Sequence, residues 1–268
     1  MIRNLIVHCY PRRSGMWRRT LAHLTAGRRW QQFTGRKIVT IALDHCTADG
    51  DAVAAEWPAE CEIIFRRNDC AQEVGSFLPM LERLASRAAE EFTTYVHCKG
   101  ATQSRGYGSH GWLDFMAAAN LDYPRLLECF WQRGANIAGA FRVNGGAWAL
   151  PGNHGWHYAG TWFTFRHSRI FGALDWRNVH GEFFGVEAWP GIVPFEESAC
   201  LFWDDAATAD LYSPAFQALR VRPAMNHWRR ALAAAGLDPL AARAPNLKPF
   251  APLPNRAEPP KLNRQFAD

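Results

Sequence analysis

Lys37-Ile38-Val39-Thr40-Ile41-Ala42-Leu43 is a short apolar run rich in β-branched side chains, which predicts a buried β-strand. Similar runs lie at residues 4–10 before it and at residues 62–65 and 93–97 after it. The intervening segments have the apolar spacing of helices, and they cover residues 15–30, 51–57 and 75–89. Strands that alternate with helices are typical of βαβ units, so we predict an α/β fold with a mostly parallel central sheet flanked by helices.

The second half of the chain is less regular. Residues 112–134 have the pattern of one long helix that ends at a glycine. Residues 136–143 predict a further buried strand, and residues 157–165 alternate as a strand does. Residues 245–268 hold six of the 16 prolines, which predicts an extended or disordered tail. We expect one domain over residues 1–244, and two smaller lobes are the alternative at this length.

Composition narrows the class of protein. Apolar residues make up 48% of the chain and charged residues 21%, and no stretch approaches the roughly 20 apolar residues that cross a bilayer. The N-terminus lacks the pattern of a signal peptide, and the seven scattered cysteines have no zinc-site spacing. We therefore expect a soluble, cytoplasmic protein with reduced thiols.

The charge of the chain suits anionic partners. The net charge is +5, and arginines of the N-terminal third supply much of it. Such a surface can attract phosphates, nucleic acid or acidic lipid head groups, or it can be a basic face that only water contacts.

One candidate site follows the strand at residues 93–97. The strand ends in His97, and Lys99 and Gly100 come directly after it. Ligands of parallel sheets bind beyond the carboxyl ends of the strands. A lysine there can neutralise a diphosphate, and a histidine can donate a hydrogen bond or move a proton. The alternative is a structural histidine beside a solvated lysine.

A second group of polar residues follows the strand at residues 62–65. Asn68 or Asp69 can cap the next helix, whose first amide groups favour an anion or a ribose hydroxyl. Arg66 and Arg67 are candidates for contacts with phosphate, and solvent-exposed arginines beside a helix cap are the alternative.

Two further groups lie in the second half. Residues 152–163 are dense in His, Trp and Gly, so His154, Trp156 and Trp162 are candidates for binding a sugar or a nucleobase, and an aromatic core is the competing interpretation. Glu187 is a single carboxylate among aromatic residues and is a candidate general base. It can equally pair with an arginine or cap the sheet.

Three common enzyme signatures are absent from the sequence. There is no P-loop, no His-Glu-x-x-His and no Gly-x-Ser-x-Gly. P-loop, zincin and α/β-hydrolase functions therefore lose support.

The order of these motifs resembles that of bacterial GT-A-like glycosyltransferases, broadly akin to rhamnan-synthesis and other polysaccharide-assembly proteins. The matching pieces span roughly residues 4 to 205, and they are Asn68-Asp69 with Glu73, Val74 and Phe77, then His97 to Gly100, Trp112, Gly139, Trp156 to Phe163, and Glu187 to Pro190.

The resemblance implies that residues 1–100 bind a nucleotide-sugar donor and that residues 101–244 bind an acceptor. Its donor site would comprise Asp69, Arg66, His97 and Lys99, and its acceptor site would comprise His154, Trp156, Trp162 and Trp189. Glu187 would be the base of an inverting reaction, and His157 would orient donor or acceptor.

The metal-binding motif of many such enzymes is replaced in this chain, so the sequence leaves open whether it uses a metal ion. Many GT-A enzymes hold Mn²⁺ or Mg²⁺ with an Asp-x-Asp motif after the fourth strand, and this chain has His97-Cys98-Lys99 there. We expect Lys99, helped by His97 and Arg66, to take the role of the cation. No other cofactor is indicated.

The sequence thus supports a glycosyltransferase that acts on a glycan or lipid-linked acceptor, with peripheral contact to an anionic inner membrane. A non-catalytic carbohydrate- or nucleotide-binding module of the same fold is the alternative. We expect no nucleic-acid partner, because few aromatic residues lie among the N-terminal arginines.

Overall fold

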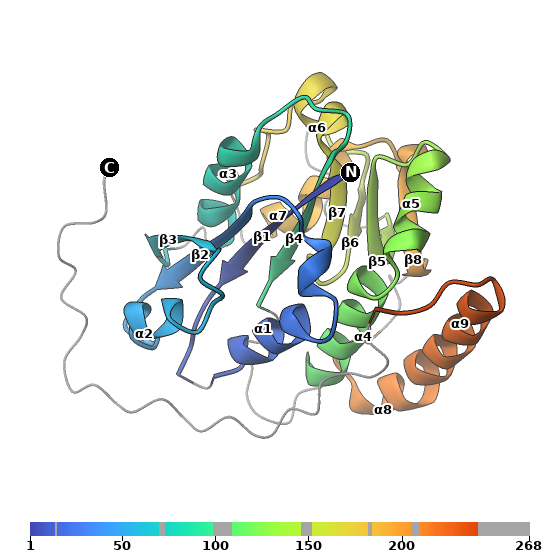
Figure 1. Ribbon diagram of the computed structural model, residues 1–268, viewed down its shortest axis with the longest axis horizontal. Coiled ribbons are helices and arrows are strands. Elements are labelled where there is room, and N and C mark those ends of the chain that lie inside the picture. The colour runs from blue at the N-terminus through green and yellow to red at the C-terminus, as the bar shows by residue number, and fades with distance from the viewer. Residues whose placement is uncertain are drawn as a thin grey trace.

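A computed structural model of the chain describes residues 1–13, 15–69, 73–98, 109–145, 152–181, 184–204 and 210–240. At the centre of these residues is an eight-stranded sheet in the order β3-β2-β1-β4-β7-β5-β6, with β8 paired to β5 (Figure 1). The strands are β1 (Ile2–Cys9), β2 (Lys37–Leu43), β3 (Glu62–Arg67), β4 (Glu91–His97), β5 (Ile137–Asn144), β6 (Trp156–Tyr158), β7 (Phe163–Arg166) and β8 (Ser198–Trp203).

Helices lie on both faces of this sheet (Figure 1). Those of the described residues are α1 (Trp17–Thr25), α2 (Gly50–Ala54), α3 (Glu73–Leu84), α4 (Ser109–Leu121), α5 (Pro124–Gln132), α6 (His167–Ala173), α7 (Gly185–Ala188), α8 (Pro214–Phe216) and α9 (Arg222–Ala234). Short 3₁₀ helices cover Trp30–Gln32, Trp189–Ile192 and Phe195–Glu197, and a π-helical turn, Gln217–Val221, joins α8 to α9.

The strand directions confirm the predicted α/β class with a mostly parallel sheet. Strands β3, β2, β1 and β4 are parallel to their neighbours, and β8 is parallel to β5. Strand β7 is antiparallel to both β4 and β5, and β6 is antiparallel to β5. The parallel half brings four carboxyl ends to one edge of the sheet.

Alternation along the strands divides the core into two parts. In β1, Leu5 and Val7 pack into one apolar cluster, which includes residues of α1 and α4, whereas Ile6 packs into another, which includes residues of α3 and α7. Because successive side chains of a strand point to opposite faces, His8 lies on the same face as Ile6. In β4, paired in register with β1, His97 lies opposite His8 and thus also faces α3.

Two predicted elements of the second half are wrong in extent. The helix expected over residues 112–134 is two helices, α4 and α5, because Pro124 has no amide hydrogen and begins a new helix. The strand expected over residues 157–165 is interrupted after Tyr158, where Gly160 and Thr161 have φ of 94° and 57°. A left-handed backbone cannot continue a strand, so β6 and β7 are separate. The tail predicted at residues 245–268 lies outside the described residues.

Candidate functional site

Two ionisable residues meet where β4 ends. Nδ1 of His97 lies 2.7 Å from Oε2 of Glu73, in the first turn of α3, and the Tyr95 hydroxyl donates to the same oxygen at 3.2 Å. A carboxylate only accepts hydrogen bonds, so Nδ1 of His97 donates and the orientation of the ring is fixed. The other ring nitrogen, Nε2, is buried, and among the described residues it makes no hydrogen bond.

A second histidine lies beside this pair. His8 is opposite His97 in the register of β1 and β4, and its Nδ1 lies 3.0 Å from the Ser76 hydroxyl of α3. Burial lowers the pKa of His8 to about 4, although the nearby Glu73 carboxylate acts in the opposite direction. At neutral pH the His8 imidazole is therefore uncharged.

A third polar group gathers at the carboxyl ends of β1, β2 and β3. Oδ2 of Asp44 accepts a hydrogen bond from the Tyr10 hydroxyl at 2.7 Å and another from Nδ2 of Asn68 at 2.9 Å. These donors, together with the backbone amide of Cys46, lower the pKa of Asp44 against the opposing effect of its burial. The donors hold the Asp44 carboxylate ionised at the sheet edge.

The predicted residues Arg66 and Asp69 lie near this edge, beside the first turn of α3. A side chain built on Gly75 would lie 3.6 Å from Nη2 of Arg66 and 3.7 Å from Oδ1 of Asp69. Arg66 is half-buried and Asp69 is exposed. The residues that would form the N-cap of α3 lie outside the described part of the chain.

The structure brings the two predicted catalytic residues together. Oε1 of Glu187, on α7, accepts a hydrogen bond from the backbone amide of Gly160 at 3.1 Å. His157, on β6, is buried, and its desolvation lowers its pKa while the Glu187 carboxylate partly opposes that change. Glu187 thus lies beside a histidine whose protonated form is disfavoured by burial.

The turn between β6 and β7 links Glu187 to His97. Gly160 contacts the Glu187 carboxylate, and Nε1 of Trp162 donates to the backbone carbonyl of His97 at 2.9 Å. Between them, Thr161 has a φ of 57°, which is unusual for a β-branched residue. Its hydroxyl is buried and, among the described residues, makes no hydrogen bond. Strained backbone and unpaired buried polar atoms gather at functional sites more often than elsewhere.

Three predicted acceptor residues occupy core positions. Trp156, Trp162 and Trp189 are each 1% exposed, and their indole nitrogens donate to the backbone carbonyls of Val193, His97 and Trp176. Rings buried on both faces cannot stack on a sugar, so the structure does not support them as binding platforms. The competing interpretation, an aromatic core, describes them better.

The remaining predicted site residues are His154 and Lys99. His154 is exposed, and its backbone amide donates to the carbonyl of Gly191 at 2.7 Å. Lys99 lies outside the described residues, so its predicted contact with a diphosphate stays a prediction.

Several residues of the site were not singled out from the sequence. Tyr10 is the last residue of one predicted strand and Asp44 comes directly after another, so the strand-end rule that pointed to His97 could have found them. The role of Glu73 has no such signal, because it depends on how α3 packs on the sheet. His8, within an apolar run, has none either.

Comparisons with known proteins found only distant structural likenesses. No protein-family model and no curated protein matches the chain. Among solved structures, a 4-diphosphocytidyl-2C-methyl-D-erythritol synthase is similar at 13% identity and a TM-score of 0.40, over 84% of this chain and 100% of that one. A protein from Desulfovibrio desulfuricans G20 described as a nucleotide-diphospho-sugar transferase is similar at 10% identity and a TM-score of 0.33, over 87% and 96%. Likenesses this distant carry no inference about activity.

Within the described ranges, no helix combines the length and the apolar character that crossing a bilayer requires.

Proposed function

We propose that this chain transfers a sugar from a nucleotide diphosphate to a glycan or lipid-linked acceptor. The observation that carries the proposal is the Glu73 and His97 pair at the carboxyl end of β4, which the turn around Thr161 joins to Glu187. Parallel sheets bind ligands beyond this edge. The resemblance of the motif order to GT-A-like glycosyltransferases agrees with a donor at this edge.

The donor would lie along the carboxyl ends of β1 to β4. Tyr10, Asp44 and Asn68 offer hydrogen-bonding groups to a ribose or a base, and Arg66 offers a positive charge to phosphate. His97 is held through Nδ1, so Nε2 is the ring nitrogen that would meet a phosphate oxygen. Lys99, directly after the strand, would add the charge that a metal ion supplies in many enzymes of this kind.

In the proposed reaction, Glu187 is the residue that would contact the acceptor. Its carboxylate has about four lone-pair positions, and the Gly160 amide takes one of them. Glu187 would accept the proton of the acceptor hydroxyl while that oxygen forms a bond to the anomeric carbon. The bond from the anomeric carbon to the diphosphate oxygen breaks, and the nucleoside diphosphate leaves with the bonding electrons. His157, uncharged beside Glu187, would orient the acceptor.

A binding module without catalysis is the second candidate. It is favoured by the hydrogen bond from the Gly160 amide to Glu187, because a carboxylate that holds a turn in place can be structural. In that case the site binds a nucleotide or a carbohydrate and transfers nothing.

A thermal-shift screen of UDP, GDP, CDP, dTDP and their sugars, with and without Mn²⁺, tests the donor site, since a ligand that binds only the folded state raises the melting temperature. One nucleotide should raise it in the wild type and lose its effect in His97→Ala. The exposed His227 on α9 provides the matched control, and His227→Ala should keep the shift. If no nucleotide changes the melting temperature, the proposed donor site is wrong.

The variant Glu187→Gln separates the two candidates. A transferase should lose about 10²–10⁴-fold in transfer rate while its nucleotide shift persists, because a general base contributes that much. Glu82→Gln, at an exposed position of α3, should leave both unchanged. Nucleotide binding without measurable transfer in the wild type, and with no effect of Glu187→Gln, would favour the binding module.

A further inference from the structure

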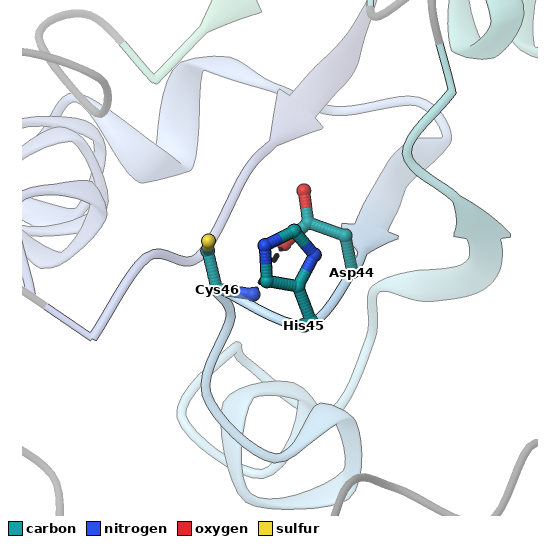
Figure 2. Close-up of side chains that lie close together, drawn as sticks. All are labelled: Asp44, His45 and Cys46. Carbon is teal, nitrogen blue, oxygen red and sulfur yellow. Dashed lines mark hydrogen bonds between the residues drawn. The ribbon is translucent and has the colours of Figure 1, made fainter.

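A cluster of potential metal ligands lies on the turn after β2. Asp44, His45 and Cys46 are consecutive, and one donor atom from each lies within 4.8 Å of the other two. Figure 2 shows the three side chains projecting from the turn to the same side. The cluster contains a carboxylate oxygen, an imidazole nitrogen and a thiol sulfur.

The carboxylate is fixed by other residues. Oδ2 of Asp44 accepts from Tyr10 and Asn68, and Oδ1 accepts from the backbone amide of Cys46 at 2.7 Å. Two carboxylate oxygens provide about four lone-pair positions, so one on Oδ1 is left after these three bonds. Hydrogen bonds of this kind hold the carboxylate ligands of metals in place in proteins.

The other two side chains are available. His45 is exposed and Cys46 is half-buried as a free cysteine. In the part of the chain that the structure describes, no hydrogen bond engages the His45 ring or the Cys46 sulfur. Both can therefore turn toward a cation without breaking a hydrogen bond among the described residues.

We propose that Asp44, His45 and Cys46 bind a divalent cation of the zinc class. Thiolate and imidazole ligands suit Zn²⁺ and Co²⁺, whereas Mg²⁺ and Mn²⁺ prefer oxygen ligands. Bond lengths of about 2.0–2.3 Å set tetrahedral zinc ligands about 3.5 Å apart, so the donor atoms must approach one another by up to about 1.3 Å. Rotation of the exposed His45 side chain can supply much of this movement.

Binding is balanced in charge. The Cys46 thiol loses its proton on binding, as metal-bound cysteines do. The thiolate and the Asp44 carboxylate then neutralise the two positive charges of the cation. Three protein ligands leave a fourth position for water or for an oxygen of a ligand.

The metal site shares Asp44 with the ribose or base part of the proposed donor site, but it does not depend on the transfer reaction. It lies at the carboxyl end of β2, whereas the charge on a leaving diphosphate would be met at the end of β4. Metal binding can be measured without any nucleotide, so its failure and that of the transfer reaction are distinguishable.

An anaerobic Co²⁺ titration of the full chain tests the proposal. The wild type should bind one equivalent and show a thiolate-to-cobalt charge-transfer band. Cys46→Ser should abolish the band, while Cys129→Ser, at an exposed position on α5, should keep it. His45→Ala should weaken Zn²⁺ binding at least tenfold, measured by competition with a coloured chelator, and His227→Ala should not.

Circular dichroism of each variant checks that it folds. The proposal is overturned if Cys46→Ser retains the charge-transfer band, or if folded His45→Ala binds Zn²⁺ as tightly as the wild type. An absence of the band in the folded wild type would also overturn it.

Discussion

His97 and Glu73 lie 24 positions apart in the sequence, yet Nδ1 of His97 is 2.7 Å from the Glu73 carboxylate. The contact joins the carboxyl end of β4 to the first turn of α3. Glu73 is 8% exposed, and the buried Tyr95 hydroxyl shares its Oε2 atom. A carboxylate this deeply buried needs such donors, because an unpaired buried charge is costly.

Replacing the carboxylate of this pair should weaken both stability and ligand binding. Glu73→Gln keeps the size of the side chain but removes the charged acceptor, and a hydrogen bond to a charged group contributes about 1.5–3 kcal/mol. We expect the free energy of unfolding to fall by that amount in urea denaturation. The nucleotide-induced thermal shift should shrink as well, because the His97 ring is no longer fixed. A full shift in folded Glu73→Gln would contradict a role for this pair in binding.

Gly160→Ala should destabilise the fold more than Gly155→Ala. Both glycines have positive φ, 94° and 74°, so each alanine costs about 1–2 kcal/mol of backbone strain. A methyl group at Gly160 would also overlap Sδ of Met116, whereas nothing lies within 4 Å at Gly155. Overpacking adds about 1–3 kcal/mol at Gly160 alone. Equal losses of unfolding free energy in the two variants would show that this packing is not as tight as described.

The buried ion pair between Arg29 and Asp122 should be sensitive to removal of one charge. Arg29 donates through Nε and Nη2 to the two carboxylate oxygens at 2.6 and 2.8 Å, and the side chains are 1% and 2% exposed. Asp122→Asn should cost about 3–5 kcal/mol, because it leaves a buried guanidinium uncompensated.

Glu82→Gln is the matched control for that experiment. Glu82 lies 3.8 Å from Arg177, and both side chains are more than half exposed. An exposed pair contributes at most about 1 kcal/mol. Similar losses of unfolding free energy in Asp122→Asn and Glu82→Gln would contradict the expectation that burial makes an ion pair more sensitive to the loss of one charge.

His167 should make the fold sensitive to acid. It is buried, and burial lowers its pKa to about 4 from 6.5 even though Oε2 of Glu91 lies 3.3 Å away. Below pH 6.5 the unfolded chain binds a proton that the folded chain does not, so the stability associated with His167 is lost as the pH falls from about 6.5 toward 4.

A substitution isolates this effect from other titrating groups. Between pH 7 and pH 5 the wild type should lose about 2 kcal/mol relative to His167→Gln, as each unit of pKa difference corresponds to 1.36 kcal/mol. Urea denaturation at both pH values measures this change. If the difference in unfolding free energy between the wild type and His167→Gln does not change with pH, His167 takes up its proton in the folded chain as readily as in the unfolded chain.

The sequence alone determined the regular half of the fold. Strand β2 was predicted with its observed bounds, and the alternation of strands and helices over the first hundred residues predicted the parallel sheet. These features depend on local periodicity, which the residues carry themselves. The same reasoning placed His97 at the carboxyl edge, because the end of a strand is a local property.

The tertiary structure decided what periodicity cannot encode. Packing of α3 on the sheet brought Glu73 to His97, and the turn at Gly160 brought Glu187 toward the same segment. Whether Trp162 offers a ring to a ligand or fills the core depended on which elements cover it, and it proved to be 1% exposed. Contacts between distant residues form only when the chain folds, so the sequence indicated the candidate side chains and the fold determined which of them meet.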